Sequence, residues 1–230
     1  MTDPYIYPNT RILINKLDIR DEDKLDDAEN TIVVLNSEFL IKNPIKITSV
    51  FDIKKIHKQL FSDLYEWAGE NRKMNMFKSE PILGGLSVSY SDYRYIDEDL
   101  KHLDIEFKSV DWRSITTNEK LYTMVEMISR LWRIHCFREG NTRSVTMFLY
   151  LLMKQYGVKV NSDYIGDRAK YFRNALVEAS LDEYSDFKPL REILKDAVYV
   201  KVSNGIEEKY KTIRGYNLDK YNYQKHEYKD

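Results

Sequence analysis

Four kinds of group that suit phosphate transfer fall within nine residues of this sequence. His135 can accept a proton near neutral pH, and Glu139 is a hard oxygen ligand suited to a magnesium ion that bridges phosphates. Gly140 and Asn141 stand where we expect a helix to begin, and the unpaired N–H groups of a helix N-terminus attract anions. Arg143, one turn further on, can bind phosphate oxygens with its planar guanidinium. Each residue alone has an ordinary structural interpretation, but together they indicate a phosphate-transfer site.

Two helices must position this polar stretch. Apolar residues recur at helical spacing on both sides of it: Leu121, Met124, Val125, Ile128 and Trp132 before it, and Val145, Phe148, Leu149 and Leu152 after it. Thr116 and Glu119 form a capping-box pattern that predicts the start of the first helix. We therefore expect the polar stretch to be the loop between two core helices.

The remainder of the chain predicts further helices and one hairpin. Helical spacing of apolar residues marks five more segments: Leu25, Ala28, Ile32, Leu35 and Phe39; Ile53, Ile56, Leu60, Leu64 and Trp67; Tyr95, Leu100, Leu103 and Phe107; Phe172, Ala175, Leu176 and Ala179; and Leu190, Ile193, Leu194 and Ala197. Alternation in residues 73–77 and 86–90 predicts two short strands joined by a loop, as in an ordinary surface hairpin. The predicted fold class is mainly α-helical with one short β-hairpin.

A second histidine, His57, falls on one of the expected helices among lysines. Cys, Asp and further His residues are absent from metal-ligand spacing beside it, so its pattern is not that of a metal site. We therefore expect His57 to have a structural role.

Composition sets the outer limits for the whole chain. With 230 residues, 43% of them hydrophobic, the chain can fill one large globular domain with a short appendage. A net charge of −1, from 36 basic and 37 acidic residues, gives no electrostatic argument for nucleic-acid binding. The single Cys136 excludes an internal disulfide framework and fits a reducing cytosol. The opening lacks a signal-peptide pattern and no apolar run could span a membrane, so we expect a cytoplasmic protein, with export by a dedicated secretion system left open.

The polar stretch resembles the signature of the Fic family, His-x-Phe-x-Asp/Glu-Gly-Asn-Gly/Lys-Arg followed by a second Arg. Six of its residues match in order and spacing: His135, Phe137, Glu139, Gly140, Asn141 and Arg143. Further stretches of the chain are similar to bacterial Fic proteins, namely residues 3–8, 56–61, 64–69 and 171–176. The resemblance therefore covers most of the chain.

This resemblance implies a Fic-type helical bundle over residues 1–200, with the active-site motif at 135–146. In the family a β-hairpin flap lies over the active site and docks an extended segment of the target protein by strand addition. The segment at about 72–90 is similar to that flap, so a target protein is expected to dock beside His135. Residues 201–230 would then be a C-terminal appendage, a short helix with a polar tail.

The implied activity is protein adenylyltransfer, in which AMP passes from ATP to a Tyr, Ser or Thr hydroxyl of a target protein. His135 would take the hydroxyl proton as the oxygen attacks the α-phosphorus, and Glu139 would hold Mg²⁺ against the phosphates. The ATP-binding residues would be Gly140, Asn141, Thr142 and Arg143.

The sequence departs from the family pattern at two places in the motif. Thr146 stands where the second Arg is expected, and Thr142 where Gly or Lys is usual. One class of Fic proteins carries an inhibitory Glu in a C-terminal helix; Glu207 has the right spacing from Ser203, but the better register places Arg214 there. These departures are consistent with control by a separate small antitoxin-like partner, or with a catalytically weakened member.

Three alternatives to adenylyltransfer remain open from the sequence. A reversed nucleotide would make the protein a kinase, although the Lys that marks that variant is absent at Thr142. A binding module would capture a partner through the hairpin and bind ATP without transfer. A third alternative transfers a different nucleotide, such as UMP.

Overall fold

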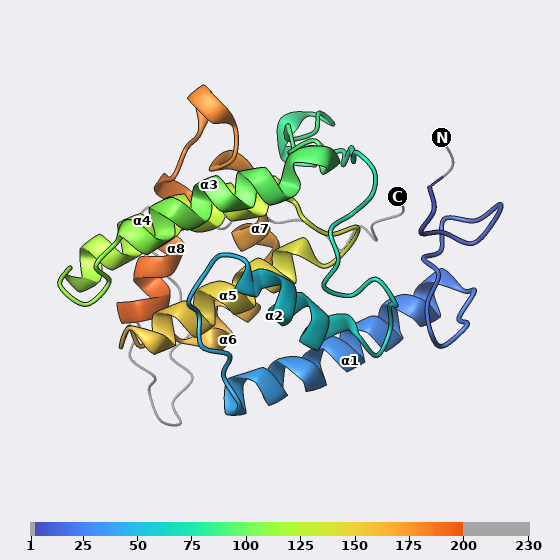
Figure 1. Cartoon of the computed structure of the whole chain (residues 1–230), viewed down its shortest axis with the longest axis horizontal. Coiled ribbons are helices and arrows are strands. Elements are labelled where there is room, and N and C mark those ends of the chain that lie inside the picture. Colours follow the sequence, from blue (N-terminus) through green and yellow to red (C-terminus); the bar gives the residue numbers. More distant parts are fainter. Residues whose placement is uncertain (1–2, 200–230) are drawn as a thin grey trace. The chain divides into compact units, whose positions relative to one another are not determined.

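The computed structural model describes residues 3–199, and their architecture is a bundle of packed helices (Figure 1). In chain order the elements are α1 (Glu22–Lys42), α2 (Asp52–Phe61), η1 (Pro81–Leu83), η2 (Tyr93–Tyr95), α3 (Ile96–Ser109), α4 (Thr117–Ile134), α5 (Asn141–Gln155), α6 (Ser162–Gly166), α7 (Ala169–Glu178), η3 (Asp182–Tyr184) and α8 (Lys188–Tyr199). The predicted mainly α-helical class is confirmed. The predicted appendage at 201–230, with its inhibitory register, lies outside the described residues.

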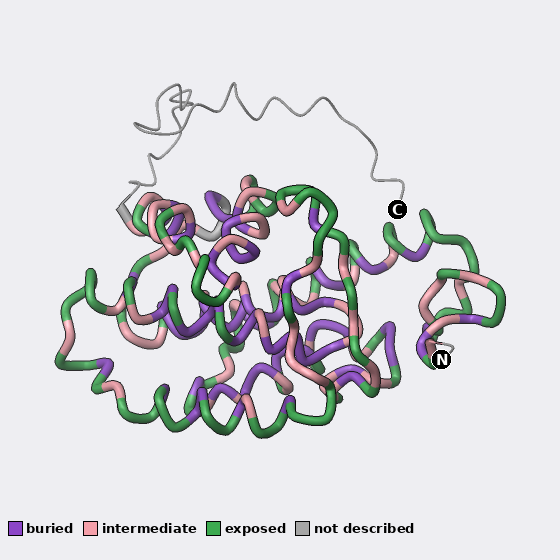
Figure 2. The backbone as a smooth tube through the Cα atoms, turned by 90° about the horizontal axis from the view of Figure 1, so that it is seen from above, coloured by how far each residue is buried: buried purple, intermediate pink, exposed green. Residues whose placement is uncertain are grey.

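Helices α4 and α5 form the centre of the bundle. Helix α5 packs against α2 and α4, while α4 also contacts α3, α7 and α8. Every apolar residue expected to face the core from these two helices is buried: Leu121, Met124, Val125, Ile128, Trp132, Val145, Phe148, Leu149 and Leu152. Figure 2 shows this concentration of buried positions along the inner helices. The loop between α4 and α5 is therefore held between two rigid elements.

The ends of α4 and α5 define the loop. The capping box is present: Thr116 accepts from the Glu119 N–H, and the Glu119 carboxylate accepts from the Thr116 N–H at 2.7 Å. Helix α4 ends at His135, whose backbone is left-handed with φ 52°. Helix α5 begins after Gly140, also left-handed with φ 78°. Two left-handed residues thus reverse the chain within a few positions.

Two helices differ from the sequence-based expectation. Helix α1 buries Leu25, Glu29, Val33 and Leu40, so Leu35 and Phe39 of its expected apolar face are exposed. The second helix was expected to continue to Trp67, but α2 ends at Phe61 and turns follow to Gly69. At that end the side chain of Asn36, on α1, donates to the Leu60 carbonyl. This carbonyl therefore accepts from a side chain of another helix where a continuing helix would use a backbone N–H.

The predicted β-hairpin is not confirmed. Residues 73–90 form an irregular loop with one short 3₁₀ turn, and the single β-bridge among the described residues joins Ile6 and Leu13. Two backbone hydrogen bonds join the two sides of the loop, from the Glu80 N–H to the Leu86 carbonyl and from the Gly85 N–H to the Glu80 carbonyl, each at 3.0 Å. The carbonyls of Met74 and Ser91 accept instead from the Arg72 guanidinium. Backbone groups that a ladder would need are thus used elsewhere.

Within residues 3–199, no helix combines the length and apolar character that a membrane crossing requires.

Candidate active site

The His135 ring is held at the end of α4 with one nitrogen free. Nδ1 lies 3.2 Å from the Trp132 carbonyl oxygen, which can only accept, so Nδ1 carries the proton. Nε2 is buried without a hydrogen-bond partner, and the Tyr90 ring stacks on the imidazole at 3.9 Å between centroids. Burial, together with the nearby Lys78 charge, lowers the His135 pKa well below its ordinary value. His135 is therefore a neutral base at neutral pH.

Arg72 fixes the backbone around His135. This buried side chain donates from Nε to the His135 carbonyl at 2.7 Å, and its other nitrogens reach the carbonyls of Met74 and Ser91. Its own N–H donates to the Cys136 carbonyl at 2.7 Å. One guanidinium thus joins the active-site loop to both ends of the 73–90 segment. This role of Arg72 could not be predicted from the sequence, because all these acceptors are backbone carbonyls.

His57 supports the same loop from α2. Its Nδ1 accepts from the Gly69 N–H at 2.8 Å, so Nε2 carries the proton and donates to the Glu139 carbonyl at 3.0 Å. The imidazole is stacked between Phe61 and Phe137, with centroid distances of 4.6 and 3.8 Å. Burial lowers the His57 pKa to about 4. These contacts are structural, as expected from the sequence.

The anion site is formed where the loop enters α5. A Cβ on Gly140 would lie 2.4 Å from the Phe61 Cζ, so a side chain has no room there. The amide of Asn141 is used within the loop: Oδ1 accepts from the Phe137 N–H and Nδ2 donates to the Phe137 carbonyl. The first N–H groups of a helix have no intrahelical partner. The Gly140 N–H donates to the Glu139 carboxylate at 2.8 Å, so the N–H groups within the first turn of α5, rather than the Asn141 side chain, are available to an anion.

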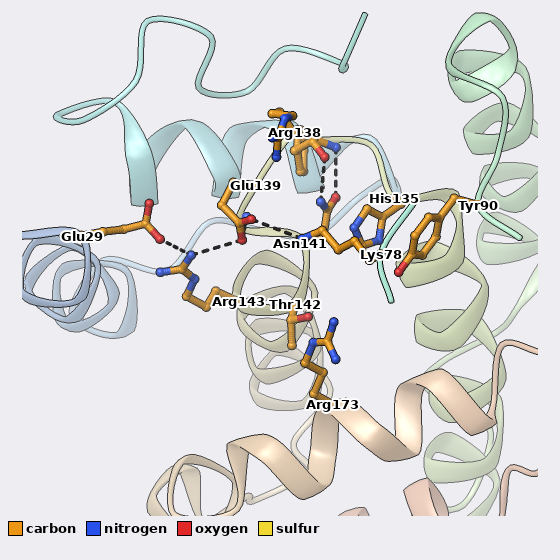
Figure 3. Close-up of polar contacts among 12 residues, drawn as sticks. Glu29, Lys78, Tyr90, His135, Arg138, Glu139, Asn141, Thr142, Arg143 and Arg173 are labelled. Atoms are coloured by element: carbon orange, nitrogen blue, oxygen red, sulfur yellow. Dashed lines mark hydrogen bonds and ion pairs between the residues drawn. The ribbon is translucent and has the colours of Figure 1, made fainter. Parts of the chain in front are cut away.

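Charges alternate along one side of this anion site (Figure 3). Arg143 forms an ion pair with Glu29 of α1 and lies 3.5 Å from the Glu139 carboxylate. The Lys78 ammonium contacts the other Glu139 oxygen at 3.2 Å. Burial opposes ionisation of Glu139, but the charges of Lys78 and Arg143 hold its pKa well below the ordinary value. Glu139 is therefore an ionised carboxylate at neutral pH.

The two departures from the expected motif have simple structural roles. The Thr142 hydroxyl accepts from the Trp132 indole N–H at 2.9 Å, and the Thr146 hydroxyl donates to the Thr142 carbonyl at 2.8 Å. Neither hydroxyl points freely into the site. Thr142 could therefore contact a phosphate through its backbone N–H in the first turn of α5, rather than through its hydroxyl.

The structure brings all six predicted site residues together: His135, Glu139, Gly140, Asn141, Thr142 and Arg143 (Figure 3). It adds Glu29, Lys78, Tyr90 and Arg72, whose positions in the sequence are remote from the motif. Spacing within the motif could not reveal them, since they reach the site only through the packing of other elements.

The site offers one carboxylate, that of Glu139, to a magnesium ion. Among residues 3–199, no group of three His, Cys, Asp or Glu side chains is placed to enclose a metal. Mg²⁺ commonly binds one or two carboxylates and completes its shell with waters and substrate phosphates. The ionised Glu139, which already attracts the Lys78 ammonium, fits that type of site.

Solved structures share this fold. The BepC protein of Bartonella tribocorum, a VirB-translocated effector crystallised with AMPPNP, superposes with a TM-score of 0.72 at 23% identity, over 86% of this chain and 97% of that one. The N-terminal FIC domain of Bep8 from Bartonella sp. 1-1C superposes with a TM-score of 0.73 at 22% identity, over 84% of this chain and 94% of that one.

The sequence relatives agree with the fold. Residues 47–153 match the model of the Fic/DOC family. Protein adenylyltransferase VbhT of Bartonella schoenbuchensis is 28% identical over 79% of this chain, which spans 36% of VbhT. Probable protein adenylyltransferase y4lH of Sinorhizobium fredii is 27% identical over 82% of this chain and 92% of its own length. The family predicted from the motif is confirmed.

Proposed function

We propose that this chain is a protein adenylyltransferase that transfers AMP from ATP to a hydroxyl group of a target protein. One observation carries the proposal: the buried Nε2 of a neutral His135 has no partner, and the anion-binding start of α5 follows a few residues later. The relatives VbhT, a protein adenylyltransferase, and y4lH, a probable protein adenylyltransferase, support it. We further propose that residues 1–200 form the catalytic domain and residues 201–230 a separate appendage.

His135 would act as the general base. Its Nε2 would take the proton from a Tyr, Ser or Thr hydroxyl while that oxygen attacks the α-phosphorus and pyrophosphate leaves. The backbone N–H groups of Asn141 and Thr142 and the Arg143 guanidinium would bind phosphate oxygens and stabilise the developing charge. The Gly140 N–H donates to the Glu139 carboxylate at 2.8 Å, and it would join them once that carboxylate turns to the magnesium ion. Trp132 keeps the proton on Nδ1 and so keeps Nε2 basic.

Glu139 would hold the magnesium ion that accompanies ATP. When bound, Mg²⁺ would neutralise phosphate charge and orient the nucleotide. Lys78 would leave the Glu139 carboxylate before the ion binds, because both cations need the same oxygens. The ionised state of Glu139 supports this assignment.

The target protein would dock at the 73–90 segment. An open hollow of about 480 Å³ lies between its arms, bounded by residues that include Phe77 and Tyr90. Phe77 and Leu86 are largely exposed there, and most of the segment is outside any strand ladder, so an extended peptide could pair with it. We place the protein in the cytoplasm and propose a small antitoxin partner. Export by a dedicated secretion system is the alternative, since the structural neighbour BepC is a VirB-translocated effector.

Labelled ATP tests the proposed activity. Wild-type protein, Mg²⁺ and a cell lysate should give labelled target protein, and His135→Ala should give none. His102→Ala is the matched control, because His102 is exposed on α3 away from the site and its loss should leave transfer unchanged. Transfer at the wild-type rate by His135→Ala would contradict the general-base assignment.

One observation keeps phosphoryl transfer as a second candidate. Thr146 stands at the position of the second motif Arg, and its hydroxyl is bonded to the helix, so α5 offers only Arg143 to the distal phosphates. A nucleotide held in the opposite direction would then deliver its γ-phosphate. The position of the label in ATP distinguishes the two reactions.

A further inference from the structure

Arg173 is a second guanidinium beside the site, and the proposed reaction gives it no role. It lies on α7 and binds the Glu80 carboxylate with two hydrogen bonds, at 2.5 Å from one nitrogen and 2.8 Å from the other. The Glu80 side chain is completely buried, whereas a third of the Arg173 side chain is exposed. A buried carboxylate on an otherwise irregular loop is costly unless its partner holds it. The 73–90 segment is therefore fastened to α7 at this point.

Arg173 is connected to His135 through two residues, Glu80 and Tyr90. The Tyr90 hydroxyl donates to the same Glu80 carboxylate at 3.4 Å, and the Tyr90 ring lies on the His135 imidazole. In Figure 3 the Arg173 side chain points from α7 toward the start of α5, where Thr142 lies. Burial opposes the charge on Arg173, but the hydrogen bonds and charge of Glu80 and the charge of Glu139 outweigh it. The pKa of Arg173 is therefore raised above its ordinary value. Arg173 thus lies within the electrostatic field of the active site.

The chemistry of the pair suits an exchange of ligands. A guanidinium binds a carboxylate and a phosphate with the same two-pronged geometry, so Glu80 occupies Arg173 as a phosphate would. The first two turns of α5 supply one cation, Arg143, and this residue is already paired with Glu29 and Glu139. A triphosphate carries several negative charges and needs more positive charge around it than Arg143 alone supplies.

We propose that Arg173 is a phosphate-binding residue of the nucleotide site and that Glu80 competes with the nucleotide for it. This inference rests on the proposed function in one respect, that the ligand is a nucleoside triphosphate. On binding, phosphate oxygens replace Glu80 on the Arg173 guanidinium, and Glu80 moves out toward water because it cannot stay buried without a partner. Tyr90 loses its acceptor in the same step, which releases its ring from His135. Nucleotide binding thereby uncovers the base for the target hydroxyl.

Two matched variants separate this role from a purely structural one. Glu80→Gln and Arg173→Gln each remove one charge of the same ion pair. If the pair only fastens the loop, both variants loosen it and change nucleotide affinity in the same direction or not at all. If Glu80 competes for a phosphate-binding Arg173, the two variants change the affinity in opposite directions.

Calorimetric titration with Mg²⁺ and AMPPNP gives the answer without any transfer step. We expect Glu80→Gln to bind about tenfold more tightly than wild type and Arg173→Gln about tenfold more weakly, the effect of one charge-assisted hydrogen bond. Adenosine, which has no phosphates, should bind all three proteins alike. Arg173→Lys, which keeps the charge, covers the case in which Arg173→Gln does not fold, and should bind AMPPNP more weakly than wild type but more tightly than any uncharged variant.

Changes in the same direction, or no change, would overturn the inference, as would a failure of both wild type and Glu80→Gln to bind AMPPNP. Its failure is distinguishable from that of the proposed function. Label transfer by wild type with affinity changes in one direction would remove only the role of Arg173. Opposite affinity changes without any transfer would leave Arg173 as a phosphate-binding residue and remove the adenylyltransferase.

Discussion

Acidification should destabilise this protein through His57, and the structure gives the magnitude. The neutral ring is required in the folded state, because Nδ1 accepts from the Gly69 N–H while Nε2 donates to the Glu139 carbonyl. A second proton on the ring would place an N–H against the Gly69 N–H. It would also place a charge between the Phe61 and Phe137 rings, where water cannot reach it.

The pKa difference sets the size and sign of the effect. Burial lowers the His57 pKa to about 4 in the folded protein, against about 6.5 in the unfolded chain. The unfolded state therefore binds more protons between these values, and folding stability is complete above about pH 6.5 and falls as the pH drops toward 4. By about pH 5 the loss from His57 alone is about 2 kcal/mol in the free energy of unfolding.

Urea unfolding at about pH 7.5 and about pH 5 measures this loss. His57→Gln keeps a donor for the Glu139 carbonyl but has no titrating ring, so it should lose about 2 kcal/mol less than wild type between the two conditions. His102→Gln, at an exposed position, should show the full wild-type loss because it leaves His57 in place. An equal loss in wild type and His57→Gln would refute the reasoning.

Two further predictions concern the residues that shape the active-site loop. Gly140→Ala should lower the free energy of unfolding by about 2 kcal/mol, from left-handed strain and the clash with Phe61, and Phe61→Leu in the same chain should recover part of it; urea unfolding of the two proteins tests this. Arg72→Met should cost about 3 kcal/mol and lower the melting temperature in calorimetry, because buried carbonyls such as that of His135 lose their donor; an unchanged melting temperature would contradict this.

The local parts of the fold could be predicted from the sequence. Helical spacing identified α4 and α5, and the capping box at Thr116 and Glu119 marked the start of α4, since both signals depend on neighbouring residues. The six residues of the candidate site were also within reach, because they lie in one short loop whose ends are fixed by these helices. For Leu35 and Phe39 the spacing was misleading, since packing against α2 uses another face of α1.

The residues contributed by other elements could not be predicted. Arg72 binds backbone carbonyls, which have no sequence signature, and Glu80 meets Arg173 across more than ninety positions of the chain. The alternation in the 73–90 segment predicted strands, but Arg72 and Arg173 hold that segment by side-chain bonds instead of a ladder. Alternation of apolar and polar residues shows which side chains could face the same side of a strand. It does not show whether distant side chains, such as those of Arg72 and Arg173, bind the segment instead.

The central claim is that AMP, rather than the terminal phosphate, is transferred to protein. Purified wild type and His135→Ala should be incubated with Mg²⁺ and a lysate, using ATP labelled at the α-phosphate in one set and at the γ-phosphate in the other. We expect label on protein from the α-position alone, as for the adenylyltransferases VbhT and y4lH, and only with wild type, because His135 supplies the base. Label from the γ-position alone would make the protein a kinase, and absence of His135-dependent label from either position would contradict transfer of any part of ATP.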